Sequence, residues 1–544
     1  MSNHISPRER SDESPASDRT EILDDCSGRG TADDPYVLTT VVDLDAIRVE
    51  PTAHYELGAD IDAIETQSWN DGAGFEPIGD DATPFSGMLD GCGHEITGLY
   101  ICRPEDRLVG LVSVNTGTIE RLKLDSLEVT GAAVTGGIAG EQLGTIRRCT
   151  VDGTIEGENA VGSVVGKNLD RIDAVTSNAT VTGEESVGGL AGENRCEVLD
   201  NGLAGDHRGE ISDSANEGTV TGTTQVGGIT GKNSETIRDS TSTGSVSGET
   251  DVGGIAGHNR GTIESVRSDA EVTGDKRVGG LAGENSTGQV LDSHASGDVI
   301  GGRSVGGIVG ENSHNSSVIK NSRDGYISGA KWIGGVVGWQ EGTVRHCAVT
   351  GRIEVDEFVA GGIAGKAGSG TIEESVADCN IDCSGIVVGG LVGKLGSRTT
   401  LHDSLATGSV SGEGIAGGCV GEGEANAEIR RVLATGRVRT FGDESVAKRL
   451  VERILTVLGY SGVGGVVGKG RATVADSYWD TETTNQSSDS ILPAARGLRT
   501  ERLQGDPAQE HLSAFDFDQT WRTNDGDYPT LRSLPTTDTD YSDN

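Results

Sequence analysis

The stretch VGGITGKNSETIRDSTSTGSVSG, residues 226–248, decides the fold. Its short runs of Val, Ile, Ser and Thr are broken by Gly or Asn every five to eight residues, so no helix of useful length fits. Three short strands joined by turns would instead form one coil of a parallel β-helix. Such coils stack about 4.8 Å apart.

The unit Gly-Gly-apolar-small-Gly inside this stretch recurs twelve times between residues 136 and 468, with small variations and mostly at intervals of 26 to 28 residues. A fixed period of this length indicates a solenoid, in which each coil buries its apolar face against its neighbours. We therefore predict an all-β chain. It would form a single right-handed parallel β-helix of about thirteen coils of about 26 residues, with small N- and C-terminal caps and one inserted helix.

Each position of the repeat has a structural interpretation. The residue before the glycine pair, as at Val226, and the apolar residue after it, as at Ile229, are expected to point inward and stack. The glycine pair is expected to permit positive φ and close backbone approach at a tight corner. A column two residues after the last glycine predicts a structural ladder of amides rather than a row of metal or sugar ligands. Its members are Asn168, Asn194, Asn233, Asn259, Asn285 and Asn312.

Aromatic residues gather at both ends of the chain, and residues 101–325 contain none. Because a solenoid needs capped ends, these aromatic residues indicate the caps. We predict a disordered acidic tail (1–28), an N-terminal cap with the first coils (29–108), the repeats (109–478), a C-terminal cap (479–535) and a disordered tail (536–544).

Two insertions interrupt the period. An extra thirteen residues around 195–208 indicate a partial coil that was duplicated into a loop. The stretch DESVAKRLVERILTVLG, residues 443–459, carries one apolar stripe at helical spacing, with Asp443 as a cap and Gly459 as the stop. It predicts a helix packed on the flank of the solenoid, and a helix that binds a partner is the alternative.

The charge balance limits the partners. The chain has 85 Asp and Glu against 44 Lys and Arg, a net charge of −41. We expect no nucleic-acid partner, because a polyanion would be repelled along most of this surface. Such acidity is typical of a protein kept hydrated in concentrated salt, and we infer a salt-loving, haloarchaeal source. No apolar run reaches the roughly 18 residues of a membrane span, and no secretory signal is visible.

The nine cysteines do not follow the repeat as a regular column. Cys149 and Cys347 share a column but lie seven coils apart, too far for a disulfide. Cys379 and Cys383 form one close pair without a His or a second pair, a weak metal signal, so we predict no metal and no cofactor. Cys149 and Cys347 are interpreted as buried replacements in a serine column. That column contains Ser214, Ser240, Ser293 and Ser322.

Several stretches carry a family resemblance beside the repeated GG[IL]xG. They are GTADDPY (30–36), GFEPIG (74–79), LDGCGHEITGLYI (89–101), SYWDTET (477–483) and YPTL (528–531). Together they resemble the GLUG-motif family of bacterial and archaeal repeat proteins. The resemblance implies a β-helical surface or secreted protein, often adhesin-like, without catalytic residues. Some large members join such repeats to IgA-cleaving metallopeptidases, but His94-Glu95 is not followed by the second His of a zinc-protease helix.

Paired carboxylates one coil apart would approach the spacing of retaining glycosidases. Asp213 and Asp239 form one such pair, and Glu284 and Glu311 form another. Neither pair is accompanied by Arg, Lys or His in a recurring cluster, and coincidences are expected among 85 acids. We therefore predict that the protein is not an enzyme and assign no catalytic residue.

A group of aromatic residues in the middle repeats is the candidate binding site. Trp332 is one residue before an inward position and is expected to face outward, and Phe358 falls near the same column one coil later. Trp339 occupies a column that elsewhere holds Glu, Lys or His. With Tyr326, these rings could stack on carbohydrate, or they could form a local packing cluster.

We therefore predict a non-enzymatic, cell-surface or secreted protein with a binding or structural role, adhesin-like, whose partner is a polysaccharide or a surface protein. A β-helix polysaccharide hydrolase or lyase is one alternative, and an intracellular structural scaffold is another. The resemblance favours an extracellular or cell-surface location, whereas the missing signal favours a cytoplasmic one. The sequence leaves the oligomeric state open.

Overall fold

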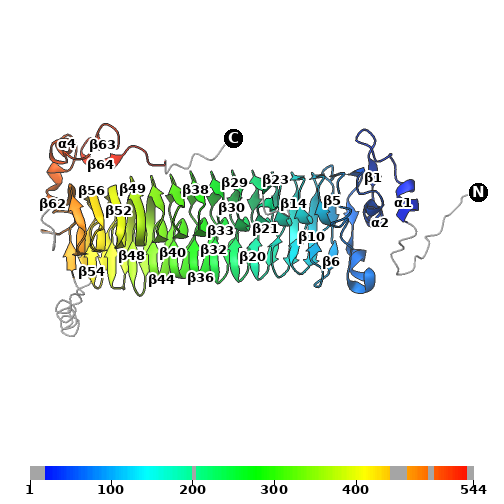
Figure 1. The fold of residues 1–544 in the computed structure, drawn as a ribbon, viewed down its shortest axis with the longest axis horizontal. Coiled ribbons are helices and arrows are strands. Elements are labelled where there is room, and N and C mark those ends of the chain that lie inside the picture. The colour runs from blue at the N-terminus through cyan, green and yellow to red at the C-terminus, as the bar shows by residue number, and fades with distance from the viewer. Residues whose placement is uncertain (1–18, 199–203, 441–461, 488–494, 536–544) are drawn as a thin grey trace, which may run out of the picture.

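The computed structural model describes residues 19–198, 204–440, 462–487 and 495–535. They form a parallel β-solenoid of about 13 turns with a repeat of about 27 residues, and Figure 1 shows a rod with a small cap at each end. This confirms the predicted solenoid of stacked coils. No helix in these ranges combines the length and the apolar character that a membrane crossing needs.

One coil contains five short strands rather than the three expected. Each strand pairs in parallel with its counterpart in the next coil, as Ile237 does with Ile263 and Val246 with Val272. The extra breaks arise because the chain turns at more corners than the spacing of Gly and Asn indicates. The strands of the deciding coil are β28 (Thr230–Asn233), β29 (Thr236–Arg238), β30 (Thr241–Ser242), β31 (Ser245–Ser247) and β32 (Thr250–Gly253).

The corners correct the interpretation of the glycine pair. Positive φ falls on polar residues, at Gln225 (56°), Asp239 (50°) and Asp251 (57°), whereas neither Gly227 nor Gly228 has a positive φ. A Cβ built on Gly228 would lie 2.2 Å from the carbonyl oxygen of the stacked glycine one coil later. The pair is therefore required by the close approach of neighbouring coils, and not by backbone conformation.

The interior consists of stacked apolar columns. Val226 and Ile229 are fully buried, as are their counterparts in neighbouring coils, which confirms their inward orientation. Each column continues along the rod because the strands are in register, Val226 lying opposite Val252. This continuity joins the coils into one hydrophobic core.

The serine column is correct except at one position. Ser214 accepts a backbone hydrogen bond from the preceding coil at 3.1 Å, and Cys347 is buried in the same column. Between them, the residue that accepts the backbone N–H of Ser293 is Asn321, at 3.0 Å. Ser322 lies one residue further on, opposite Ala348. The 28-residue interval displaces the register there by one residue.

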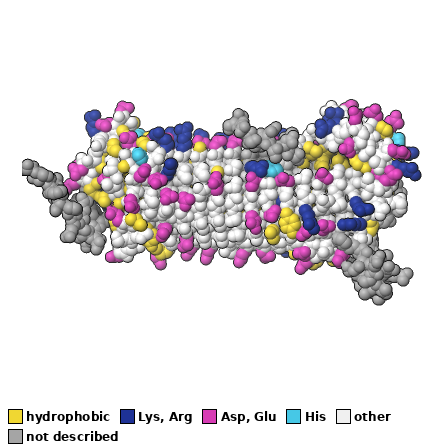
Figure 2. All heavy atoms as spheres, turned by 180° about the vertical axis from the view of Figure 1, so that it is seen from behind, with side chains coloured by type: hydrophobic (Ala, Val, Ile, Leu, Met, Phe, Trp, Pro, Cys, Tyr) yellow, Lys and Arg dark blue, Asp and Glu magenta, His cyan; other side chains and the backbone are white. Residues whose placement is uncertain are grey.

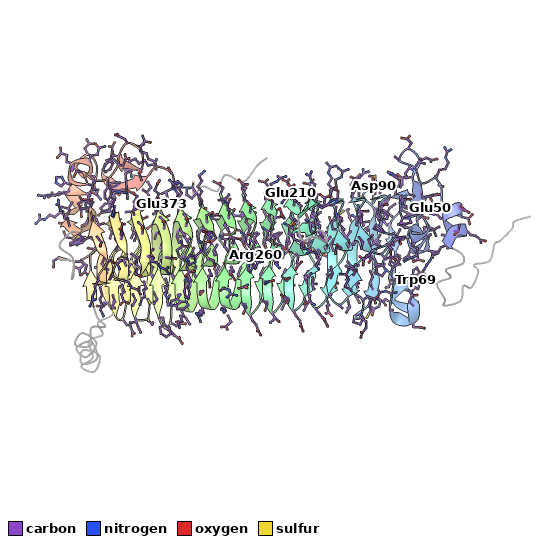
Figure 3. The ribbon with its side chains drawn as sticks, viewed as in Figure 1. Glu50, Trp69, Asp90, Glu210, Arg260 and Glu373 are labelled. Carbon is purple, nitrogen blue, oxygen red and sulfur yellow. The ribbon has the colours of Figure 1, made fainter. Side chains whose placement is uncertain are left out.

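Cross-coil ion pairs follow one edge of the rod. Arg238 pairs with Glu210 of the preceding coil at 2.6 Å, and Arg345 pairs with Glu373 of the following coil at 3.4 Å. Figure 3 shows Asp90, Glu210 and Glu373 along this edge. Pairs this exposed each contribute only about 0.2–1 kcal/mol, so they fix register more than they add stability.

The N-terminal cap begins earlier than expected. Residues Arg19–Asp25 form helix α1, within the segment 1–28 that was predicted to be a disordered tail. Leu23 is buried, and Arg19 pairs with Asp45 at 2.7 Å, so burial and an ion pair hold this helix against α2 (Val41–Ala46). The rest of the cap contains β1 (Tyr36–Leu38), η1 (Ile47–Val49), β2 (His54–Leu57), β3 (Ile61–Asp62), η2 (Ile64–Ser68), η3 (Asn70–Gly72) and β4 (Met88–Asp90).

The C-terminal cap packs against the last coils. Trp521 is fully buried, its ring lies 4.5 Å from that of Phe515, and its indole N–H donates to Asp403 at 3.2 Å. This contact joins the cap to a coil more than a hundred residues earlier. The elements at this end are β61 (Ser477–Asp480), β62 (Ala495–Leu498), η4 (Thr500–Arg502), α4 (Pro507–His511), β63 (Trp521–Asn524) and β64 (Asp527–Leu531).

The structure describes one of the two predicted insertions. The insertion at 195–208 contains an antiparallel pair, β22 (Cys196–Val198) and β23 (Ala204–Arg208), so it is a hairpin and not a partial coil. The predicted helix at 443–459 lies outside the described residues, as does the tail at 536–544.

Candidate functional site

Two tryptophans form the centre of the candidate site. Trp332 is in β44 (Tyr326–Gly334) and Trp339 is in β45 (Val337–Gln340). Their ring centroids are 4.5 Å apart with the ring planes at 86°, an edge-to-face arrangement that aromatic rings favour. Trp332 has a left-handed φ of 60°, which bends β44 near its end, and the next strand, β45, carries Trp339.

Both tryptophans are partly buried, so the outward orientation expected for Trp332 is only partly right. The indole of Trp332 rests on a small apolar cluster from the following coils, formed by Val359, Val387 and Ile415. The two interpretations of this group, ligand binding and packing, are thus not exclusive. One side of the pair packs on the rod, and the other side meets solvent.

Phe358 lies one residue off the expected column. Ile333 pairs with Ala360, which places Phe358 opposite Lys331 and not opposite Trp332. Its side chain is 38% exposed. Tyr326 is separate: its hydroxyl donates to Glu354 at 2.7 Å, and within the described ranges its ring contacts none of the other three. We call Trp332, Trp339 and Phe358 the aromatic patch.

Three cations lie against the aromatic patch. The Arg303 guanidinium is 4.4 Å from the centroid of Trp332. Lys331 lies 4.9 Å from the rings of both Trp332 and Phe358, and Lys366 lies 5.0 Å from Trp332 and 4.4 Å from Trp339. Cations at these distances are attracted to the ring faces. Figure 2 shows a hydrophobic group bordered by Lys and Arg on the half of the rod nearer the C-terminal cap.

The asparagine column is buried and bonded along the rod. Asn168 donates to Asn194, and the bonds continue through Asn233, Asn259, Asn285 and Asn312 at 2.8–2.9 Å. Each amide also donates to a turn carbonyl, as Asn233 does to Glu235 at 3.0 Å. The ladder ends at Gln340, which accepts from Asn312 at 2.9 Å. All these side chains are fully buried, so the column is enclosed in the structure.

A charged cluster two coils before the aromatic patch was missed from the sequence. Arg277 forms ion pairs with Asp251 and, at 3.4 Å, with Glu284, and Glu284 lies opposite both His258 and Glu311. Arg277 and His258 thus accompany the Glu284–Glu311 pair at this one place on the rod, and not as the recurring cluster that the sequence was searched for. The repeat gave no signal, because Arg277 replaces residues of several other types in its column.

The surroundings shift the pKa values of this cluster. Burial lowers the pKa of His258 to about 4, and it raises the pKa of Glu284 and of Glu311. Ligand atoms of Asp251, His258 and Glu284 lie within 4.8 Å of one another, but the guanidinium of Arg277 already supplies the positive charge between the two carboxylates. The arrangement thus fits an internal ion pair better than a metal.

The other candidates are the second carboxylate pair and the buried thiols. Asp213 and Asp239 occupy left-handed corners, with φ of 49° and 50°. Burial raises the pKa of both Cys347 and Cys379 to about 12, which keeps these thiols protonated and unreactive.

The fold defines a β-solenoid repeat protein, and comparison with known proteins agrees. The GLUG motif matches residues 274–300. The chain thus carries a GLUG motif within its β-solenoid, as the resemblance of its repeats implies.

Two relatives share part of the sequence. Halomucin of Haloquadratum walsbyi is 42% identical over 154 residues, 26% of this chain and 2% of that protein. A presumed Gly-rich membrane protein of Evansella cellulosilytica is 36% identical over 132 residues, 23% of this chain and 15% of the other. The matched segments are thus a small part of either relative. The crystal structure of a presumed immunoglobulin A1 protease from Bacteroides ovatus aligns with 93% of this chain and 94% of the protease chain, at 14% identity. The TM-score is 0.22, which is too low to support a conclusion about fold or function.

Proposed function

We propose that the protein is a non-enzymatic rod of the cell surface that binds glycan through the aromatic patch. The observation that carries this proposal is the pairing of Trp332 and Trp339 at 4.5 Å with Phe358 exposed nearby, on a rod whose other middle coils present small polar and acidic side chains. Flat aromatic rings are suited to stack on sugar rings at a shallow surface.

The fold and the relatives support a surface role. A solenoid holds its binding face on a long scaffold that does not need a large globular core. One relative is named as a membrane protein. Locating the native protein by fractionation of source cells tests this part, and a protein found wholly inside the cells would favour the intracellular scaffold.

The binding experiment compares wild type with Trp332→Ala and Trp339→Ala on a broad glycan panel in molar salt. We expect each change to weaken binding about tenfold, because one stacked ring contributes roughly 0.5–1.5 kcal/mol beyond its buried area. Ile64→Ala is the matched control, since Ile64 is 59% exposed in the N-terminal cap. Circular dichroism must show that all variants remain folded, because Trp332 also packs on the rod.

A wild-type protein that binds no glycan on the panel would refute the proposal. Equal loss in Ile64→Ala would show that the effect is not specific to the patch.

A hydrolase is the second candidate, favoured by the register of Glu284 opposite Glu311. Coils stack about 4.8 Å apart, near the carboxylate spacing of retaining glycosidases. We expect no new reducing ends when the protein is incubated with polysaccharides. Release of reducing ends that Glu284→Gln abolishes would establish the enzyme instead.

A further inference from the structure

A row of cations runs along the rod beside the aromatic patch. Lys276 lies opposite Arg303, and Arg303 lies opposite Lys331, in three successive coils. We call these three residues the basic row. Like charges directly opposite each other on neighbouring strands are destabilising, so such a row is costly in a free protein.

Among the described residues, no acidic side chain forms an ion pair with this row, although the protein has 85 acidic residues. The same holds for Lys366, which lies beside the row, opposite Trp339. Burial and the neighbouring Lys394 lower the pKa of Lys366. Glu341 and Glu424 lie close enough to oppose that shift, but neither is paired with it. Glu311 likewise acts on Lys276 without forming an ion pair with it. Within the described ranges, the positive charge at the patch is thus opposed by nearby carboxylates but not held in direct ion pairs.

The same cations cover the aromatic faces. Arg303, Lys331 and Lys366 lie within 4.4–5.0 Å of the ring centroid of Trp332. A neutral sugar would have to displace a cation to stack on this indole. An acidic sugar could instead pair its anionic group with that cation and set its ring against the neighbouring aromatic edge.

We infer that the aromatic patch and the basic row together bind acidic polysaccharide, whose carboxylate or sulfate groups pair with Arg303, Lys331 and Lys366. This inference rests on the proposed glycan binding and names its ligand class. Successive coils place one cation every 4.8 Å or so along the rod, so a chain lying along the axis meets a cation at each coil. An extended polymer is matched better than a single sugar.

The experiment uses probes that differ only in charge. Binding of the full chain to polygalacturonate is compared with binding to its neutral methyl ester, and dextran sulfate is compared with dextran. Both series are measured in 1 M NaCl, where the screening length is about 3 Å and the net charge of the protein no longer repels a polyanion at long range. We expect the acidic member of each pair to bind at least about tenfold more tightly.

Variants locate the effect. Arg303→Gln combined with Lys331→Gln should weaken polygalacturonate binding about tenfold and change binding to the methyl ester less than about twofold. Lys123→Gln is the control, because Lys123 is an exposed lysine in β10 (Lys123–Thr130), far from the patch. Circular dichroism and melting curves show whether each variant keeps the fold.

The outcomes separate the two proposals. Binding of neutral and acidic polymers with equal affinity would overturn this inference and leave glycan binding intact. Binding of no polymer at all would overturn both. If polyglutamate bound as tightly as polygalacturonate, the site would recognise polyanions in general, and the assignment of a sugar would be wrong.

Discussion

Replacing Asn233 by Ala would cut the amide ladder in the middle of the rod. Asn233 accepts a hydrogen bond from Asn194 at 2.8 Å and donates to Asn259 at 2.8 Å and to the carbonyl of Glu235 at 3.0 Å. Its amide also donates to the carbonyl of Thr262 at 3.4 Å, and alanine removes all four bonds at a fully buried site. Asn194 keeps a second acceptor, the carbonyl of Thr236 at 3.2 Å, and the Glu235 carbonyl keeps the backbone N–H of Thr262 at 2.8 Å. The group that loses its partner is the side-chain oxygen of Asn259.

The size of the loss follows from this one group. A buried polar group without a partner costs about 1–3 kcal/mol, and the small cavity left by the amide adds to this. We expect Asn233→Ala to lower the free energy of local opening by about 2–4 kcal/mol. Because 1.4 kcal/mol corresponds to a factor of ten, amides in the adjacent coils should exchange with solvent roughly a hundredfold faster.

Hydrogen exchange followed by mass spectrometry measures this effect coil by coil. Each coil contacts only its neighbours, so faster exchange should be confined to the coils around Asn194, Asn233 and Asn259. Asn178→Ala is the matched control, since Asn178 is exposed. Less than tenfold acceleration next to Asn233, or equal acceleration in the control, would refute the idea that the ladder stabilises the rod.

Three further results are expected. Melting temperature should rise by several degrees from low to molar salt, because ions screen repulsion in a chain of net charge −41; a flat profile would contradict a salt-adapted surface. The pKa of His402 is raised to about 9 from 6.5 by its hydrogen bond to Asp403, so this contact stabilises the fold below pH 6.5 and is lost as pH rises through 9. His402→Gln should flatten the alkaline part of the stability profile, measured by tryptophan fluorescence during denaturation, and an unchanged profile would contradict this. A thiol reagent should label exposed Cys92 in the native protein and leave buried Cys347 unlabelled until unfolding; early labelling of Cys347 would show that the coil opens there.

The repeat predicts the columns of this fold well, because strands in register stack the residues that occupy the same position of successive repeats. Val226 and Asn233 could be assigned from spacing alone, since every coil repeats their environment. Contacts that occur once are not visible in a period. The ion pairs of Arg277 and the cations around Trp332 depend on side chains that reach between columns at one place on the rod.

Local conformation was also harder to predict than register. The left-handed corners fall on residues such as Gln225 and Trp332, whose type gives little indication of positive φ. The glycines that suggested those corners are explained by crowding between coils. A one-residue change of interval was enough to move the serine column from Ser322 to Asn321.

The amide ladder also has a mechanical consequence. Its hydrogen bonds run from coil to coil along the rod, so a pull on the two ends would load them in parallel with the backbone bonds between coils. Beyond Gln340 the same column holds Ala367 and then Leu395, which add no such bond. Under tension, the coils after residue 340 would part before those between 168 and 340. A rod pulled at its C-terminal end would thus extend by unwinding from that end. The coils between 168 and 340, which the amide ladder joins, would keep their length.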